Sequence, residues 1–249
     1  MDNIRQHFAL RSSIYNTHCG WVKQTDLLQA IANAIGNVDH KIKILDLGAG
    51  TGAISNYLYD SFGSKADIFA LDISIDMLSK ITNPSIHKIE GTAEYLPFED
   101  NYFDFVVSRQ CLHYVDKIDT AIEEIFRVLK NDGNFILSQI VPIENDSLQH
   151  WINFTRFRQP LRKTFFSEKE WIEVICKHGF SLINITNHSH RGSMNRWIKQ
   201  YRVTSIEEIN TYKNYFINSS ELFKHTYEVD ITDADIQNTA FWSTLKFSK

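Results

Sequence analysis

The chain has 249 residues, 43% of them hydrophobic, which is enough for one full core, so we expect a single α/β domain. Its net charge of −4 gives no general attraction to a polyanion, so nucleic acid is not an expected partner. No segment approaches the ~20 consecutive apolar residues of a membrane-spanning helix, and no apolar run follows a basic start, which predicts a soluble, cytoplasmic protein. The cysteines Cys19, Cys111 and Cys176 form no CxxC pair, which argues against disulfides or a thiolate metal site.

The N-terminal region, residues 1–40, is expected to form a helical lid. Thr25–Ile35 has the apolar spacing of an amphipathic helix, and Gly36 ends it. The residues before this helix mix aromatic and polar side chains without a clear period. We therefore expect them to cover a binding site rather than to belong to the sheet.

From Ile42 onward, short apolar runs alternate with amphipathic segments, which is typical of a parallel sheet with helices on both faces. One predicted helix is Thr120–Lys130, and another begins at Ser167, whose spacing to Glu170 is that of a capping box. The pattern predicts a doubly wound, mostly parallel α/β sheet of seven strands. The strand candidates are Ile42–Leu47, Ile68–Asp72, Ser85–Ile89, Phe103–Ser108, Asn134–Ile140, Phe180–Thr186 and Ala240–Phe247.

An insertion is expected before the last strand, since about fifty residues separate it from the sixth, far more than a hairpin loop needs. Met194–Tyr201 and Ser205–Phe216 carry helical apolar stripes, so the insertion is expected to be a helical cap over the active site. The expected organisation is one domain over residues 1–249, with a lid at 1–40, a core at 41–188, the cap at 189–235 and a closing strand at 236–249.

The segment Ile44–Gly52, ILDLGAGTG, joins the first strand to a helix by a turn with three alternating glycines. Glycines allow a tight turn and close approach by a ligand. The spacing is GxGxG rather than the GxGxxG of nicotinamide enzymes, and Asp46 precedes the first glycine, which favours a cationic, phosphate-free nucleoside. Asp72 ends the second strand, where such acids accept hydrogen bonds from ribose hydroxyls; a helix N-cap is the alternative, although Ser74 is better placed for it.

These features, together with GTAEYLPFEDNYFDFVVS and SRQCLHYV, resemble the class I S-adenosylmethionine-dependent methyltransferases, in particular those of ubiquinone biosynthesis and the biotin pathway. The resemblance runs from about Asn3 to Thr186. It implies a Rossmann-like core, S-adenosylmethionine as cofactor, S-adenosylhomocysteine as product, and no metal. The cofactor-binding residues it implies are Tyr15, Asp46, Gly48, Ala49, Gly50, Asp72, Ile73, Met77, Thr92, Ala93, Glu94, Arg109 and Gln110.

The resemblance also implies roles for several of these residues. Asp46 would hold the amino-acid end of the cofactor, and Ile73 and Met77 would flank the adenine. Members of the family commonly have Asp where this chain has Thr92, and a hydroxyl accepts a hydrogen bond from the adenine amino group more weakly than a carboxylate. We therefore expect a difference in adenine affinity at this position.

On the acceptor side, His113 is the candidate general base, and a helix-turn residue bonded to backbone is the equally weighted alternative. Tyr15 would close over the sulfonium or simply pack as an aromatic residue. Phe154–Lys163 combines four basic residues with aromatic ones and is either a solvated loop or lid, or a site for an acidic small molecule or carrier phosphopantetheine. The candidate substrate residues are Tyr15, His113, Arg158, Trp197 and Tyr201.

Aromatic residues of the cap leave two interpretations open, an aromatic or heterocyclic acceptor or ordinary packing of the cap helices. They are Trp197, Tyr201, Tyr212, Tyr215 and Phe216. His188 and His190 form an HxH pair, but no nearby Cys or carboxylate completes a metal-ligand set.

The sequence therefore predicts one-step methyl transfer to an oxygen, nitrogen or carbon of a small-molecule acceptor in secondary or cofactor metabolism. One alternative is methylation of a carrier-bound acyl group or of tRNA. Another is a regulatory subunit that binds the cofactor but has lost the chemistry. The acceptor and the oligomeric state are left open.

Overall fold

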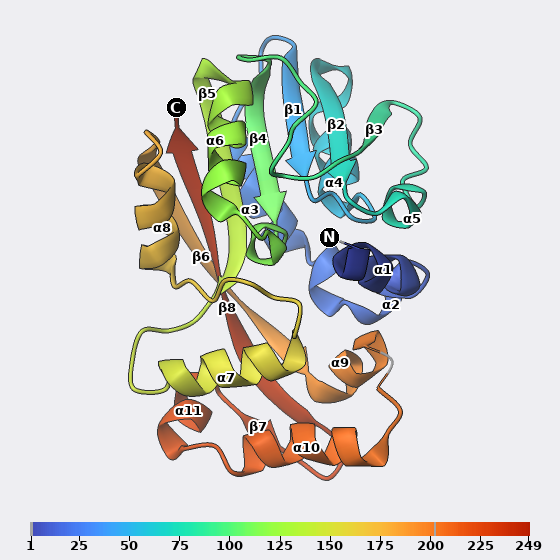
Figure 1. The fold of residues 1–249 in the computed structure, drawn as a ribbon, viewed down its shortest axis with the longest axis vertical. Coiled ribbons are helices and arrows are strands. Elements are labelled where there is room, and N and C mark those ends of the chain that lie inside the picture. The colour runs from blue at the N-terminus through green and yellow to red at the C-terminus, as the bar shows by residue number, and fades with distance from the viewer. Residues whose placement is uncertain (1, 202) are drawn as a thin grey trace.

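The computed structural model describes residues 2–201 and 203–249, and Figure 1 shows a sheet with helices around it and further helices below its lower edge. The strands are β1 (Ile42–Leu47), β2 (Ala66–Asp72), β3 (Ile86–Glu90), β4 (Phe103–Arg109), β5 (Leu129–Val141), β6 (Ser181–Ser193), β7 (Asp230–Ile231) and β8 (Ile236–Ser248). The α-helices are α1 (Asp2–Arg11), α2 (Tyr15–His18), α3 (Thr25–Ile35), α4 (Ala53–Phe62), α5 (Ile75–Leu78), α6 (Ile118–Val128), α7 (Leu148–Arg158), α8 (Glu168–Cys176), α9 (Met194–Tyr201), α10 (Ile206–Ile217) and α11 (Glu221–Thr226).

The sheet has the strand order β3-β2-β1-β4-β5-β8-β6, and β7 pairs with β8. Strands β1 to β5 are parallel, whereas β8 runs antiparallel to β5 and β6. The prediction of a mostly parallel α/β sheet is confirmed. The expected number of seven strands is corrected to eight, because the two-residue β7 is too short to form an apolar run that a sequence pattern can detect.

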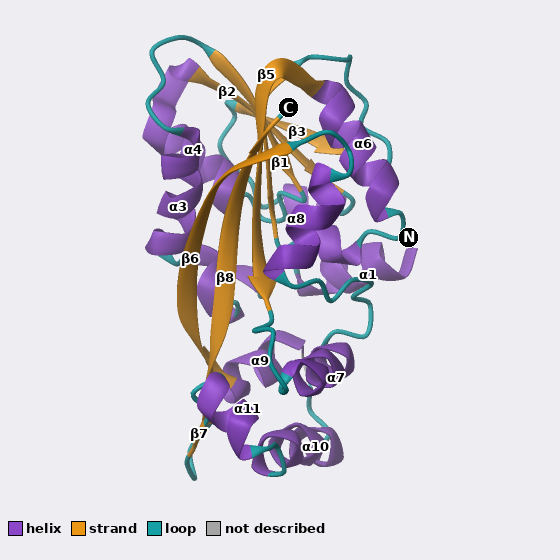
Figure 2. Ribbon diagram, turned by 90° about the vertical axis from the view of Figure 1, so that its left-hand side faces the viewer, coloured by secondary structure: helices purple, strands orange, loops and turns teal. Residues whose placement is uncertain are grey.

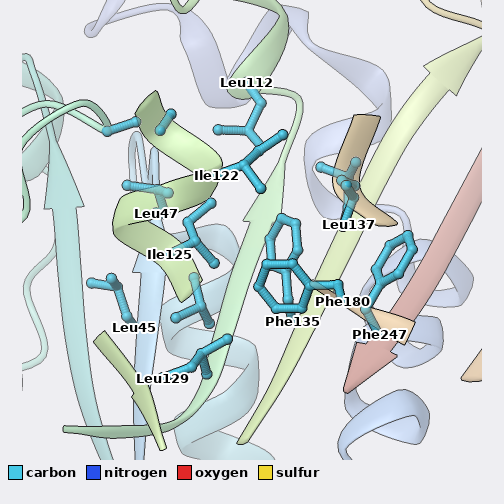
Figure 3. Close-up of a cluster of buried hydrophobic side chains, with 14 of the residues drawn as sticks. Leu45, Leu47, Leu112, Ile122, Ile125, Leu129, Phe135, Leu137, Phe180 and Phe247 are labelled. Carbon is cyan, nitrogen blue, oxygen red and sulfur yellow. The ribbon is translucent and has the colours of Figure 1, made fainter. Parts of the chain in front are cut away.

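Two apolar clusters lie on opposite faces of the sheet, and Figure 2 shows α3 and α4 on one side and α6 and α8 on the other. Ile125 of α6 and Trp171 of α8 pack with Phe135 of β5 in the first cluster, part of which Figure 3 shows. Ile31 of α3 and Leu58 of α4 pack against the other face. Full burial of each such side chain contributes about 1.5–3 kcal/mol, so this layering fixes the positions of the strand ends.

A third apolar cluster holds the cap together and comes from two separate parts of the chain. Trp151 and Phe154 of α7 pack with Phe216 of α10 and Phe223 of α11. The cap is therefore not confined to residues 189–235: α7, which lies within the expected core range 41–188, is part of it. A pattern along the chain cannot show that two insertions share one hydrophobic cluster.

Strands β6 and β8 extend well beyond the sheet as a two-stranded ribbon. The predicted sixth strand ends at Thr186, but β6 continues to Ser193, and its outer residues pair with β8 as in Arg191 with Thr239. Most residues of β6 are exposed, since it is an edge strand, so it lacks the continuous apolar run by which buried strands are recognised. The ribbon connects the sheet to the cap.

Several local predictions are confirmed residue by residue. α3 has the predicted bounds Thr25–Ile35, and Ser167 forms the predicted capping box with Glu170 at the start of α8. Ser205 caps α10 by accepting from the backbone N–H of Glu208. In the part of the chain that the structure describes, no helix is long and apolar enough to cross a membrane.

Candidate active site

Three adjoining pockets lie where the carboxyl ends of β1, β2 and β4 meet α1 and α2, the region just below the arrowheads of these strands in Figure 1. We call them the strand-end pocket, beside β2 and the loop after β3, the glycine-turn pocket, beside the turn that leads into α4, and the cap pocket, between the lid and the cap. Tyr15 of α2 lines all three pockets. Ligands of open α/β sheets bind at this edge.

The glycine turn brings bare backbone to the pocket walls. Gly48 has φ +76°, and a Cβ there would lie 2.3 Å from the Sγ atom of Cys111. Gly50 has φ +54° and lines both the strand-end and the glycine-turn pocket, where an added Cβ would meet no protein atom within 4 Å. The first glycine is thus required by packing within the protein, whereas the second leaves space for a ligand.

Asp72 closes β2 with its carboxylate at the wall of the strand-end pocket. Its Oδ2 accepts from the backbone N–H of Gly50 at 2.8 Å, and its Oδ1 accepts from that of Ser74 at 2.9 Å. Burial raises the pKa of this carboxyl, and the two backbone donors oppose that shift. Ser74 caps α5 through Met77, as predicted. Each carboxylate oxygen keeps a lone pair, so Asp72 can accept two hydroxyl hydrogen bonds.

The glycine-turn pocket is lined by one carboxyl group, that of Asp46, and one guanidinium group, that of Arg109. Asp46 is 1% exposed, and its Oδ2 accepts from the backbone N–H and the hydroxyl of Ser55. Burial raises the pKa of Asp46 to about 6. Arg109 donates from Nη2 to the carbonyl of Val22, while its buried Nη1 has no partner among the described residues. Burial lowers the pKa of Arg109 to about 10. This pair suits a zwitterion whose ammonium meets Asp46 and whose carboxylate meets Arg109.

The lid is fastened to the glycine turn. Thr51 Oγ1 donates to Asn16 Oδ1 of α2 at 2.6 Å, and Trp21 lies edge-on to the ring of Tyr15 with the centroids 6.2 Å apart. At the opposite wall, Gln110 has φ +54°, a conformation that is uncommon for a residue with a side chain. Gln110 lines the strand-end and cap pockets, as do Tyr15, Phe8 and Tyr114, so these residues lie where the two pockets meet.

His113 lies in the wall of the cap pocket and is 1% exposed. Its Nδ1 lies 2.9 Å from Gln139 Oε1, and its Nε2 has no hydrogen-bond partner among the described residues. Burial, followed by the charge of Arg162, lowers the pKa of His113 well below its usual value. The imidazole is therefore neutral at pH 7, with the lone pair of Nε2 free to accept a hydrogen bond. The backbone of Lys163 donates to the His113 carbonyl, which fixes the turn.

The structure brings together the residues singled out from the sequence. Those on the strand-end pocket are Tyr15, Gly48, Gly50, Asp72, Ile73, Met77, Thr92, Ala93, Glu94, Arg109 and Gln110; the glycine-turn pocket adds Asp46 and Ala49; and the cap pocket is lined by Tyr15, His113, Arg158, Trp197 and Tyr201.

Sequence reasoning missed other lining residues. Arg11, Trp21 and Gln159 line the cap pocket, and Cys111 lines the strand-end pocket. The lid residues follow no period that would mark an inward face, so only the tertiary structure reveals them. The one available signal was the Phe154–Lys163 segment; it is not a solvated loop, because its first half is the end of α7 and Arg162 is buried.

The cap aromatics divide between the two interpretations. Trp197 and Tyr201 line the cap pocket. Tyr212 and Phe216 are buried in the cap's own cluster, and Tyr215 packs against it while its hydroxyl donates to the carbonyl of His150. Among the described residues, no group of three or more His, Cys, Asp or Glu side chains could hold a metal ion.

Comparisons with known proteins agree with this geometry. Residues 45–137 match a family model described as a methyltransferase domain. The uncharacterized methyltransferase YcgJ of Bacillus subtilis is 27% identical over 198 residues, 78% of either chain. The ubiquinone/menaquinone biosynthesis C-methyltransferase UbiE of Vibrio cholerae is 36% identical over 103 residues, which cover 38% of this chain and 40% of that protein. The crystal structure of Bacillus subtilis YcgJ shares the fold with a TM-score of 0.81 at 20% identity, over 91% of this chain and 99% of that one.

Proposed function

Since the chain belongs to the class I S-adenosylmethionine-dependent methyltransferases of the UbiE type, we propose that it methylates a small aromatic or heterocyclic acceptor bound in the cap pocket. Bound S-adenosylmethionine supplies an activated methyl group on a sulfonium. The protein's own side chains bind and orient the two reactants and remove the proton of the acceptor.

The cofactor fits the two pockets beside the glycine turn. Asp72 offers free lone pairs to two ribose hydroxyls, and Thr92 and Ala93 lie farther along the same pocket, where the adenine would end. The buried Nη1 of Arg109, which has no partner among the described residues, lies in the same pocket as Asp46 and supports placing the amino-acid end of the cofactor there. An amino acid moiety there would satisfy both groups.

One observation carries the proposal of direct transfer, namely the wall that the strand-end and cap pockets share. Tyr15 and Gln110 line both pockets, so an acceptor atom in the cap pocket can face a methyl group held in the strand-end pocket. Holding both reactants in line contributes up to about 7–11 kcal/mol in well-oriented systems. Closure of the lid through Thr51 and Asn16 would exclude water from the same place.

His113 is proposed as the general base when the acceptor carries a proton whose removal assists attack. Its Nδ1 is held by Gln139, which leaves the Nε2 lone pair for the acceptor. General base catalysis of this kind contributes about 10²–10⁴-fold. The rings of Trp197 and Tyr201 along the cap pocket support a flat acceptor, because aromatic rings pack well against one another.

We place the reaction in the cytoplasm and in secondary or cofactor metabolism. The three unbridged cysteines support a reducing compartment. The comparisons do not favour an inactive regulatory subunit, and the net charge of −4 does not favour tRNA as the acceptor.

The proposal is tested in two steps. Calorimetry measures binding of S-adenosylmethionine and S-adenosylhomocysteine, and an assay of S-adenosylhomocysteine release is then run with aromatic and heterocyclic metabolites, carrier-bound acyl groups and tRNA. Release with the first class alone is the expected result. Tight cofactor binding with no release from any class would support the regulatory alternative. Release with tRNA, falling steeply with salt, would support the nucleic-acid alternative.

A further inference from the structure

The cap pocket carries positive charge that no carboxylate on its walls balances. Arg11 of α1 and Arg158 of α7 line it, and no Asp or Glu is among its lining residues. Within the described part of the chain, neither arginine has a carboxylate oxygen within 4.0 Å, although Arg5, Arg127 and Arg191 all do. A buried charge without a partner is unfavourable unless something else pairs with it.

Among the described residues, Arg158 makes ring contacts and no side-chain hydrogen bond. Its guanidinium carbon lies 4.2 Å from the ring centroid of Trp197 and 5.6 Å from that of Phe154. Its buried Nε has no hydrogen-bond partner among the described residues. Stacking fixes the plane of a guanidinium and leaves its N–H edge available, which is the arrangement that binds a carboxylate or phosphate through two parallel hydrogen bonds.

Arg11 is 5% exposed and likewise has no anionic partner in the part of the chain that the structure describes. Its guanidinium carbon lies 4.3 Å from the ring centroid of Tyr201, and its Nη1 lies 2.9 Å from His7 Nε2. Burial and Arg11 itself lower the pKa of His7 to about 4, so His7 is neutral and accepts the hydrogen bond without balancing the charge. The Nε of Arg11 is buried without a hydrogen-bond partner among the described residues.

A third arginine, Arg162, adds positive charge beside the cap pocket. Arg162 is 5% exposed, its Nε donates to the carbonyl of Thr164, and its Nη2 has no partner in the described chain. It lies beside His113, because the backbone N–H of the next residue, Lys163, donates to the His113 carbonyl at 2.8 Å, and its charge lowers the pKa of His113. Lys163, by contrast, is paired with Asp116 at the surface. The basic segment thus turns Arg158 and Arg162 inward, while Arg156 is exposed and Lys163 is paired at the surface.

We infer that the acceptor is an anion, with a carboxylate or phosphate group held by Arg11 and Arg158 and its reacting atom facing Tyr15 and Gln110. Arg11 and Arg158 line the cap pocket but not the strand-end pocket, whereas Tyr15 and Gln110 line both, so the charged group lies on the cap side of Tyr15, against which Arg11 packs with its guanidinium carbon 5.4 Å from the ring centroid. Arg109 is a separate cation in the glycine-turn pocket. The inference rests on the proposed function and specifies its substrate class.

The test uses the full chain saturated with S-adenosylhomocysteine and titrated by calorimetry with two matched pairs, benzoate with benzamide and phenyl phosphate with phenol. Each charge-assisted hydrogen bond is worth about 10-fold or more in affinity, so at least one anion is expected to bind about 10-fold or more tighter than its neutral counterpart. The tighter of the two anions distinguishes a carboxylate acceptor from a phosphate ester. Equal binding of the charged and neutral members of both pairs, or binding of neither anion, would overturn the inference.

Arg158→Gln and Arg11→Gln are each expected to lower the affinity for the anion by about 10-fold or more, while the affinity for S-adenosylhomocysteine stays unchanged. Arg156→Gln is the matched control, since Arg156 lies on the same helix but is exposed and outside the pocket. Thermal melting shows whether each variant folds; if one does not, the comparison of anions with neutral compounds on the unaltered chain decides. Failure of S-adenosylhomocysteine to bind at all would instead contradict the proposed function.

Discussion

His113 on the turn after β4 and Gln139 on β5 form a buried side-chain pair, with Nδ1 and Oε1 2.9 Å apart. An amide oxygen only accepts hydrogen bonds, so Nδ1 carries the hydrogen and Nε2 carries the lone pair. Burial and the charge of Arg162 keep the ring neutral by lowering its pKa. The pair therefore presents a preorganised, uncharged imidazole whose Nε2 can accept a hydrogen bond in the cap pocket.

Replacing His113 with alanine should lower kcat by about 10²–10⁴-fold while the dissociation constant of S-adenosylmethionine stays within about 2-fold, because the ring lines only the cap pocket. Single-turnover kinetics and calorimetry measure the two quantities. Gln139→Leu removes only the orienting bond and is expected to lower kcat less. Parallel losses of turnover and cofactor affinity in His113→Ala would assign this residue a structural role.

Asp46 should make cofactor binding depend on pH. Its pKa of about 6 in the unliganded chain means that the carboxylate is ionised at pH 7.5 but largely protonated at pH 5. The ammonium of the cofactor pairs only with the ionised form, so affinity should fall below pH 6, by up to about 10-fold per pH unit. Titration calorimetry from pH 5 to 7.5 measures this slope, and Asp46→Asn should flatten it. An unchanged slope in that variant would place the titrating group elsewhere.

The same residue should reduce the stability of the unliganded protein. The folded-state pKa of Asp46 is raised above 3.8, so the folded chain holds the extra proton between about pH 4 and 6. The contribution of Asp46 to the free energy of unfolding is therefore most favourable below about pH 4, and this favourable part is lost as the pH rises through 6. Asp46→Asn should therefore raise the free energy of unfolding at pH 7.5 by about 1–3 kcal/mol, while it lowers the affinity for the cofactor. Chemical denaturation measures the gain, and a loss of stability would contradict the assigned burial cost.

The two pocket glycines should respond differently to alanine. Gly48→Ala must displace Cys111, which adds about 1–3 kcal/mol of overpacking to about 1–2 kcal/mol of backbone strain. Gly50→Ala bears the strain alone and should fold, with its methyl group occupying cofactor space. Denaturation and cofactor titration separate the two effects. Cys111→Gly removes both clashing atoms, so it should recover the overpacking part of the Gly48→Ala loss; no recovery would mean that the clash is relieved elsewhere.

Thr92→Asp should tighten S-adenosylmethionine binding by about 3–10-fold, because a carboxylate is a stronger acceptor for the adenine amino group than a hydroxyl. Thr92→Ser keeps the hydroxyl and serves as the control, with a change below about 2-fold expected. Competition between S-adenosylhomocysteine and its inosine analogue, which lacks the amino group, would show whether the gain arises at that contact. An equal gain for both ligands would rule the contact out.

The sequence by itself determined what depends on local chemistry. The alternation of apolar runs and amphipathic segments predicted the parallel core, and α3 and the Ser167 capping box appear as predicted, because caps and periodicity act within a few residues. The glycine turn with Asp46 and Asp72 indicated the cofactor for the same reason: these residues sit at strand ends, and the ends of parallel strands meet at one edge of the sheet.

Only the tertiary structure decided which side chains line the cap pocket. Arg11, His113 and Arg158 come from a lid, a turn and a cap helix that are distant in sequence, and no periodicity relates them. Whether Arg158 is solvated or turned inward depends on Trp197 packing over it, and the cap that holds Trp197 exists because α7 and α10 share one apolar cluster. Charge is visible in a sequence, but its burial and pairing are properties of the folded chain.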